Sequence, residues 1–556
     1  MKKSALQRAR ESYQPKLPRS LQGAVRIKYG DKTQSCGDQE EISRLFPHTY
    51  GLPVVEMERD TQPKRVEEPF NVGIILSGGQ APGGQAPGGH NVVSGIFDGI
   101  KRLNPECRLY GFLMGPAGFI NHQYMELTAN YIQQYRNTGG FDIIGSGRTK
   151  LETIDQFDQG LKILRELNIK ALVIIGGDDS NTNAAVLAEY YKEIGADVQV
   201  IGVPKTIDGD LKNQWIETSF GFDTATKVYS EMIGNIQRDC NSSKKYYHFI
   251  KLMGRSASHI ALECALQTQP NICIISEEVQ AKRMTLDNIV SQIAYFIAER
   301  AKIGWNFGTV LIPEGLIEFI PSMKKLIEEL NDILAEHGDE IAQFEEIEKL
   351  QKVHSYLSPA NAELFKSLPK HIALELCLDR DSHGNVQVSL IETESLISEM
   401  VAKRLEEMAE QGLYSGKFAT QHHFFGYEGR CADPSNFDAD YTYALGFNAA
   451  MLINAGLTGY MSSVRNLTAP SEEWIAGGIP ITMMMNMERR NGKMKPVIKK
   501  ALVNLNGRPY LRYASMRETL GLNTLYQYPG PIQYFGPSEI CDRPSMTLLL
   551  EHDHDV

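Results

Sequence analysis

Acidic and basic side chains that could act on phosphate groups follow two apolar runs of this sequence. Asp178 and Asp179 come directly after "ALVIIGG", and Lys205, Asp208 and Asp210 follow "VQVIGVP" in the segment "KTIDGD". Magnesium prefers one or two carboxylates together with phosphate oxygens, so Asp178 is a candidate metal ligand. Lysine supplies a point charge to a phosphate, and either Asp208 or Asp210 can serve as a general base toward a hydroxyl group.

A glycine-rich loop, "SGGQAPGGQAPGGHN", follows the earlier apolar run "NVGIIL". Glycines can present successive backbone N–H groups, and the helix expected to begin near Asn91 adds partial positive charge, so the loop is a candidate anion site. A flexible turn is the competing interpretation. The loop contains neither a Walker A motif nor GxGxxG, so neither a P-loop ATPase nor a dinucleotide-binding fold is indicated.

Further polar residues follow other apolar runs. Two basic residues come after "FDIIG", and an arginine, a glutamate and a Tyr–Arg pair follow three later runs. Each alone is unremarkable, but together they are typical of a pocket that binds a sugar phosphate. The residues are Arg148 and Lys150, then Arg255 with Gly254, Glu314, and finally Tyr427 with Arg430.

The elements that must position these residues alternate between strands and helices. From Asn71 onward, short Val/Ile-rich runs alternate with segments of helical periodicity, which predicts parallel sheets covered on both faces. We expect an α/β fold with two Rossmann-like three-layer domains and parallel-rich sheets. The expected parts are an N-terminal extension (1–70), a first α/β domain (71–225) completed by part of 431–556, a second (226–430) with a helical insertion (316–417), and a C-terminal region (431–556) returning to both.

Two local segments also carry expectations. "FDIIGSG" is expected to form a strand, with Arg148 and Lys150 at its end, and "TMMMNMERR" is expected to form a packed helix. Since ligands of open α/β sheets bind beyond the carboxyl ends of the strands, the polar residues after each run are expected to share a site.

Composition narrows the function classes. The chain has 556 residues, 42% hydrophobic and 22% charged, with a net charge of -11, which disfavours a nucleic-acid-binding role. No apolar run is long enough to span a bilayer, and the start lacks a secretory h-region. The eight cysteines show no CxxC or metal-ligand spacing. We therefore expect a cytoplasmic protein without disulfides or zinc and without membrane or nucleic-acid partners.

The motifs occur in an order that resembles the phosphofructokinases, and within them the long pyrophosphate-dependent clade. They are "LSGG" with "APGGHN", "GSGRTK", "GGDDSN", "PKTIDGD", "KKYYHFIKLMGRSASH", "PEG" and "GYEGR". The resemblance runs from about residue 70 nearly to the C-terminus. It implies reversible transfer of a phosphoryl group from pyrophosphate to the 1-hydroxyl of fructose 6-phosphate, with Mg²⁺. It also implies a donor domain at 71–225, a sugar-phosphate domain at 226–430, and a homodimer with shared active sites.

The resemblance assigns roles to residues at matching positions. Asp208 matches the general base, Asp178 the magnesium-linked acid, and Thr206 a contact to the sugar phosphate. The remaining matches concern the sugar: the substrate loop of Met253, Gly254 and Arg255, the acid Glu314 that reads sugar hydroxyls, the phosphate clamp of Tyr427 and Arg430, and Lys245 with Tyr246, which serve the neighbouring subunit's site.

Asp179 and Lys205 bear on the choice of donor. ATP-using relatives carry "GGDG" and "PGTID" where this chain has "GGDDS" and "PKTID". A carboxylate at Asp179 would repel the inner phosphate of a nucleotide in a low-dielectric cleft, while Lys205 would supply charge to the transferring group. We expect pyrophosphate to bind through the glycine loop, Arg148 and Lys150. Since "QAPGG" is doubled, the phosphate-contacting glycine is Gly79 when counted from the strand and Gly84 when counted from the helix.

Two alternatives remain at this point. An ATP-dependent kinase of the same superfamily, acting on a sugar, nicotinamide nucleotide or lipid, is opposed by Asp179 with Lys205. A non-catalytic regulatory subunit that binds sugar phosphate is opposed by the presence of both Asp178 and Asp208, although the doubled loop favours it.

Overall fold

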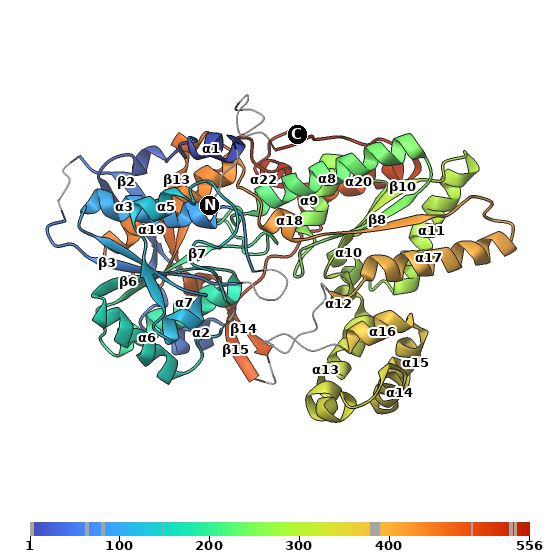
Figure 1. Ribbon diagram of the computed structural model, residues 1–556, viewed down its shortest axis with the longest axis horizontal. Coiled ribbons are helices and arrows are strands. Elements are labelled where there is room, and N and C mark those ends of the chain that lie inside the picture. The colour runs from blue at the N-terminus through green and yellow to red at the C-terminus, as the bar shows by residue number, and fades with distance from the viewer. Residues whose placement is uncertain are drawn as a thin grey trace. The chain divides into compact units, whose positions relative to one another are not determined.

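Runs rich in valine and isoleucine form the buried strands of this computed structural model of the chain (Figure 1). It describes residues 5–61, 66–78, 84–147, 149–377, 390–490, 493–532, 538 and 542–555. The chain divides into two compact units. Unit 1 comprises Met1–Ala225, Tyr427–Ala501 and Ile532–His552, and unit 2 comprises Thr226–Gly426, Leu502–Pro531 and Asp553–Val556.

A nine-stranded sheet forms the centre of unit 1. Its five central strands are parallel, and antiparallel strands complete both edges. In spatial order the strands are β1 (Val25–Lys32), β2 (Pro53–Arg59), β13 (Ile475–Pro480), β12 (Tyr460–Arg465), β7 (Gln199–Pro204), β6 (Ile169–Gly176), β3 (Asn71–Leu76), β4 (Arg108–Phe112) and β5 (Tyr124–Glu126).

Helices cover both faces of this sheet. On one face α3 (Gly89–Leu103) packs on α19 (Asn436–Asn454), and on the other lie α6 (Ile154–Glu166) and α7 (Asp178–Glu193) (Figure 1). The shorter helices of unit 1 are α1 (Ala5–Glu11), η1 (Arg19–Leu21), α2 (Gln39–Leu45), α4 (Pro116–Ile120), α5 (Ala129–Gln133), α18 (Tyr427–Arg430), η3 (Ser471–Glu473), η4 (Ile481–Met484) and α22 (Met546–Glu551).

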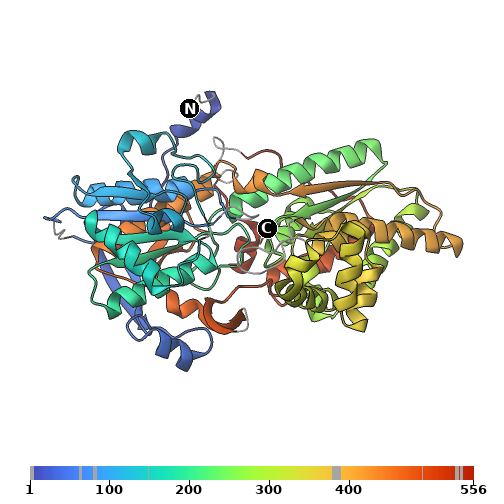
Figure 2. The same cartoon turned by 60° about the horizontal axis from the view of Figure 1, so that its bottom comes forward.

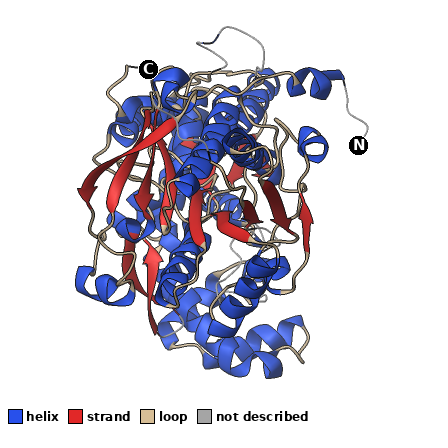
Figure 3. Cartoon of the chain, turned by 90° about the vertical axis from the view of Figure 1, so that its left-hand side faces the viewer, coloured by secondary structure: helices blue, strands red, loops and turns tan. Residues whose placement is uncertain are grey.

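Unit 2 is built on a four-stranded parallel sheet. Its strand order is β11 (Thr420–Phe425), β8 (Tyr247–Leu252), β10 (Gly308–Pro313) and β9 (Ile272–Cys273). The surrounding helices are α8 (Phe222–Ser243), which begins in unit 1, α9 (His259–Thr268), α10 (Ser276–Ala281), α11 (Leu286–Lys302) and α20 (Arg508–Leu522). Helices and strands together confirm the expected α/β architecture with parallel-rich sheets (Figure 3).

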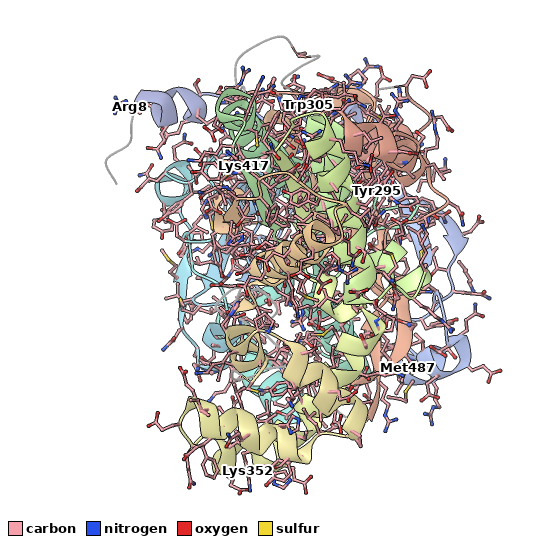
Figure 4. All side chains as sticks on the ribbon, turned by 90° about the vertical axis from the view of Figure 1, so that its right-hand side faces the viewer. Arg8, Tyr295, Trp305, Lys352, Lys417 and Met487 are labelled. Atoms are coloured by element: carbon pink, nitrogen blue, oxygen red, sulfur yellow. The ribbon has the colours of Figure 1, made fainter. Side chains whose placement is uncertain are left out.

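A run of helices leaves the sheet of unit 2 after β10. The four helices α13 (Pro321–Ile341), α14 (Glu346–Tyr356), α15 (Pro359–Ser367) and α16 (Lys370–Leu376) gather in one group, yellow in Figure 2. Lys352 of α14 lies at its outer edge (Figure 4). The short α12 (Leu316–Phe319) precedes this group and α17 (Thr393–Glu410) follows it. The apolar side chains of these helices, such as Leu326 of α13 and Ile372 of α16, belong to the hydrophobic core of the unit.

The prediction of a strand at "FDIIGSG" is wrong. Residues 142–144 form a turn, and the segment touches the sheet only through an isolated bridge between Ser77 and Gly147. Strand β3 already has β4 and β6 as neighbours, so the sheet has no open edge there. Tyr131 instead donates its hydroxyl to the Ile143 carbonyl at 2.8 Å, and the Met114 N–H donates to that of Ile144 at 2.9 Å.

The prediction of a helix at "TMMMNMERR" is also wrong. The 3-10 helix η4 ends at Met484, and the segment continues as strand β14 (Met485–Arg490), which pairs antiparallel with β15 (Lys493–Ile498). The hairpin satisfies the backbone of this segment through cross-strand hydrogen bonds.

Across the described part of the chain, none of the helices combines the length and the apolar character that crossing a bilayer requires.

Candidate active site

The turn between β6 and α7 carries the first pair of acidic residues. β6 ends at Gly176, Gly177 caps the helix in an extended conformation, and Asp178 and Asp179 occupy its first turn. The side chain of Asn181, fully buried, donates to the carbonyls of Gly176 at 2.7 Å and Gly177 at 2.9 Å. These bonds hold the start of the helix against the end of the strand, so the backbone that carries the two carboxylates is fixed.

Sequence reasoning missed the second support of this turn. A Cβ placed on Gly202 of β7 would lie 2.1 Å from Oδ1 of Asn181, so a side chain there would displace the asparagine. The signal in the sequence was weak, because Asn181 follows the acidic pair inside "GGDDSN" but Gly202 lies on the next strand.

Three carboxylates approach one another near the ends of β6 and β7. Burial, together with the nearby charges of Asp208 and Asp178, raises the pKa of Asp210 to about 7, while Lys500 opposes the rise. Lys500 places its Nζ 3.6 Å from Oδ2 of Asp178. Asp178, Asp208 and Asp210 therefore form an anionic cluster, which attracts cations.

Asp208 and Arg430 form an ion pair inside unit 1. The guanidinium Nη2 of Arg430 lies 3.0 Å from Oδ1 of Asp208, and both side chains are largely buried. The Asp208 N–H also donates to Oγ1 of Thr206 at 3.0 Å. The expected general base, the expected phosphate clamp and the expected sugar-phosphate contact are therefore neighbours, although Arg430 lies 222 residues from Asp208.

Lys205 ties the glycine loop to the strand ends. Its side chain is buried, and its Nζ donates to the Gly84 carbonyl at 2.6 Å. Gly78, with φ +124, lies beside this contact, since a Cβ there would be 2.2 Å from the Gly84 oxygen. Gly79 and Arg148, two other expected pyrophosphate contacts, lie outside the described residues. Lys150 is described, and its Nζ lies 3.7 Å from Oε1 of Glu152.

In unit 2 the expected sugar residues surround the end of β8. The N–H of Gly254, with φ +132, donates to Oε2 of the buried Glu314 at 2.7 Å. Met253 is buried and donates its N–H to the Phe425 carbonyl at 3.0 Å, and Arg255 pairs with Glu318 at 3.3 Å. The substrate loop and the acid after β10 are therefore joined directly.

Three other expected residues lie at exposed or partly exposed positions. Lys245 and Tyr246 occupy the connection between α8 and β8, where the Lys245 Nζ lies 5.0 Å from the centre of the Tyr246 ring. Tyr427, at the start of α18 in unit 1, is 48% exposed, whereas Arg430 at the end of the same helix is buried. A one-turn helix thus turns one of its two expected clamp residues outward and the other inward.

A family model described as "Phosphofructokinase" matches residues 71–453, more than half of the chain. The chain belongs to the phosphofructokinase family. Two solved pyrophosphate-dependent phosphofructokinases share its fold. The one from Nitrosospira multiformis has a TM-score of 0.51 at 16% identity, over 79% of this chain and 86% of that one. The one from Marinobacter aquaeolei has a TM-score of 0.52 at 15% identity, over 84% and 96%.

Relatives of this phosphofructokinase match it over nearly its full length. Three of them are named pyrophosphate–fructose 6-phosphate 1-phosphotransferase. The protein from Porphyromonas gingivalis is 62% identical over 99% of both chains, and that from Entamoeba histolytica is 54% identical over 100% of both. The protein from Treponema pallidum is 52% identical, covering 99% of this chain and 97% of its own.

Proposed function

We propose that this phosphofructokinase transfers a phosphoryl group reversibly from pyrophosphate to the 1-hydroxyl of fructose 6-phosphate. The products are fructose 1,6-bisphosphate and phosphate. The names of the three full-length relatives support this donor and this acceptor. The structural observation that carries the proposal is the contact of Asp208 with Arg430 in a cluster that also includes Asp178 and Asp210.

In this mechanism Asp208 is the general base. It accepts the proton of the 1-hydroxyl as that oxygen bonds to the transferring phosphorus, while the bond from phosphorus to the bridging oxygen of pyrophosphate breaks. The departing phosphate carries that electron pair. Arg430 and Thr206, which contact Asp208, bind the sugar phosphate together with Tyr427. Phosphoryl transfer needs positioning and charge stabilisation more than covalent catalysis, and this cluster can provide both.

A magnesium ion fits the donor set around Asp178. No group of three or more His, Cys, Asp or Glu side chains suited to a metal occurs in the described ranges. A site with one or two carboxylates matches the way Mg²⁺ is held when substrate phosphates complete its shell. When bound, the ion would neutralise charge on the pyrophosphate oxygens. Lys205, Lys150, Arg148 and the glycine loop at Gly79 or Gly84 would contact the same anion.

The remaining assignments concern the sugar and the assembly. Met253, Gly254, Arg255 and Glu314 would bind fructose 6-phosphate, and Lys245 with Tyr246 would serve the site of a neighbouring subunit. We also assign the protein to the cytoplasm as a homodimer. The seven cysteines that the structure describes all have free thiols, in keeping with that compartment. Plant relatives are named as alpha and beta subunits, so association of related chains has a precedent.

A donor comparison tests the function. The purified enzyme is given fructose 6-phosphate and Mg²⁺ with either pyrophosphate or ATP, and the sugar product is identified by phosphorus NMR. We expect fructose 1,6-bisphosphate with pyrophosphate and little or none with ATP. Turnover with ATP alone would support the ATP-dependent alternative, and turnover with neither donor would support the regulatory subunit.

The variant Asp208→Ser tests the mechanism. Removing one well-placed base is expected to lower kcat by about 10² to 10⁴-fold. Binding of fructose 6-phosphate, measured by calorimetry, is expected to persist. Asp197→Asn, which alters an exposed carboxylate of the same unit, serves as the control. Turnover of Asp208→Ser at the wild-type rate would remove Asp208 from the mechanism.

A further inference from the structure

Lys500 is held over the acidic cluster by its neighbours in the chain. It follows strand β15, and the flanking residues are fixed by backbone hydrogen bonds. The Lys499 N–H donates to the Met484 carbonyl at 2.9 Å, and the Ala501 N–H donates to the Asp210 carbonyl at 2.7 Å. The backbone of Lys500 is therefore positioned from both sides, and its contact with Asp178 does not depend on the side chain alone.

The side chain of Lys500 is paired with Asp178 but is not enclosed. The Nζ to Oδ2 distance is 3.6 Å, and the side chains are 36% and 22% exposed. This distance exceeds the length of a charge-assisted hydrogen bond, so the described contact with Asp178 is an ion pair without a short hydrogen bond. Lys500 also counters the negative charges around Asp210, where it opposes the rise of the pKa. It is thus a solvent-accessible cation inside the anionic cluster.

Two other cations of unit 1, both described by the structure, have different contacts. Lys205 is buried and bonded to the Gly84 carbonyl, and Arg430 is paired with Asp208. Pyrophosphate carries several negative charges and has no adenosine group to anchor it, so charged contacts must supply most of its affinity. Lys500 differs from Lys205 and Arg430 in that its side chain is partly exposed and faces Asp178.

We propose that Lys500 is a pyrophosphate-binding residue of the active site. In the absence of substrate it neutralises Asp178. Asp178 would hold the magnesium ion that accompanies the substrate, and the ammonium group of Lys500 would then contact a pyrophosphate oxygen. This inference rests on the proposed function and adds to it a residue that lies outside every motif used to recognise the family. Lys500 is a direct substrate contact, and Asp178 is its resting partner.

The test compares Lys500→Met with Lys499→Met. Lys499 is the adjacent lysine, is exposed, and makes its described backbone bond to Met484, so it is a matched control. Loss of one charged phosphate contact is expected to raise the KM for pyrophosphate by about tenfold or more. The KM for fructose 6-phosphate is expected to stay within about twofold of wild type. Lys500→Arg, which keeps the charge, is expected to restore part of the affinity.

A second readout does not depend on turnover. Pyrophosphate with Mg²⁺ is expected to raise the thermal midpoint of wild type and of Lys499→Met, and to raise that of Lys500→Met much less. Wild-type KM and wild-type stabilisation in Lys500→Met would overturn the inference, and so would an equal loss of affinity for both substrates. If the wild type itself does not use pyrophosphate, the proposed function is wrong. If the wild type is active and Lys500→Met has the same KM for pyrophosphate, only the inference about Lys500 is wrong.

Discussion

Charge balance around Asp178, Asp208 and Asp210 depends on side chains from distant segments. Arg430 is paired with Asp208 and Lys500 with Asp178, while burial and the charges of Asp208 and Asp178 raise the pKa of Asp210 to about 7. A cluster of carboxylates attracts cations and repels anions that carry no cation with them. This property suits a substrate that enters as a magnesium complex.

Asp179 allows a prediction at the same scale. It lies in the first turn of α7 beside Asp178, where its carboxylate would oppose the inner phosphate of a nucleotide. Asp179→Gly is expected to give measurable affinity for ATP, because the repulsion is removed. ATP and ADP binding would be measured by calorimetry in wild type and variant. Nucleotide affinity that is the same in both would refute the exclusion argument.

At the scale of elements, the turn from β6 to α7 depends on β7. Asn181 bonds the two carbonyls that precede Asp178, and Gly202 leaves room for it. The position of the acidic pair is thus decided by three consecutive elements. A substitution at Gly202, where β7 carries no functional side chain, is therefore expected to shift the turn that carries the acidic pair.

Gly202→Ala tests this dependence. The added methyl group would meet Asn181 at a distance that no Cβ tolerates, so Asn181 must move. We expect a loss of about 1–3 kcal/mol in the free energy of unfolding, from the cost of overpacking. The KM for pyrophosphate is expected to rise more than that for fructose 6-phosphate.

Gly338→Ala is the control for that substitution. Gly338 lies inside helix α13, and a Cβ there meets nothing within 4 Å. Alanine is a better helix former than glycine by about 1 kcal/mol, so this variant is expected to be as stable as wild type or more stable. Equal effects of both substitutions would show that the Asn181 contact is unimportant.

At the scale of the whole molecule, buried carboxyls couple stability to pH. Asp440 of α19 accepts hydrogen bonds from the Tyr13 hydroxyl at 2.9 Å and the Lys16 N–H at 2.8 Å. Burial raises its pKa to about 7, although both hydrogen bonds oppose the rise. The N-terminal segment is therefore attached to α19 through a carboxyl that holds its proton to near-neutral pH.

The sign of the pH effect follows from this shift. The unfolded chain releases the Asp440 proton near pH 4, and the folded chain near pH 7, so the stabilisation is complete below pH 4. It is lost as the pH rises through 7, by at most about 1.4 kcal/mol per pH unit. Relative to Asp440→Asn, the wild type is expected to lose thermal stability from pH 5 to 7.5. An identical pH profile in both proteins would exclude this role, with Asp197→Asn as an exposed control.

The proposed dimer can be tested by mixing two inactive variants. If Lys245 serves a neighbouring subunit, co-refolded Asp208→Ser and Lys245→Met chains form mixed dimers with one complete site. We expect recovery of about a quarter of wild-type activity, because about half of randomly paired dimers are mixed and each has one complete site. Light scattering would verify the dimer. No recovery from a verified mixture would show that Lys245 acts within its own chain.

The sequence alone determined the fold class, the family and the local motifs. Residues that follow strands in a parallel sheet share one edge, so the segments "GGDDS" and "KTIDGD" could be placed near one another without coordinates. Periodicity also predicted the alternation of parallel strands and helices that begins at Asn71. It failed at "FDIIG", because only the assembled sheet shows that β3 already has two neighbours, and at "TMMMNMERR", because pairing with β15 outweighs local preference.

Only the tertiary structure decided which distant residues meet. Lys500 reaches Asp178 because the hairpin β14–β15 returns the chain to α7, and Arg430 reaches Asp208 from the end of α18. Neither contact can be inferred from local residue spacing or from composition. Ion pairs between segments depend on how the chain closes in space, and periodicity reports only the faces of single elements.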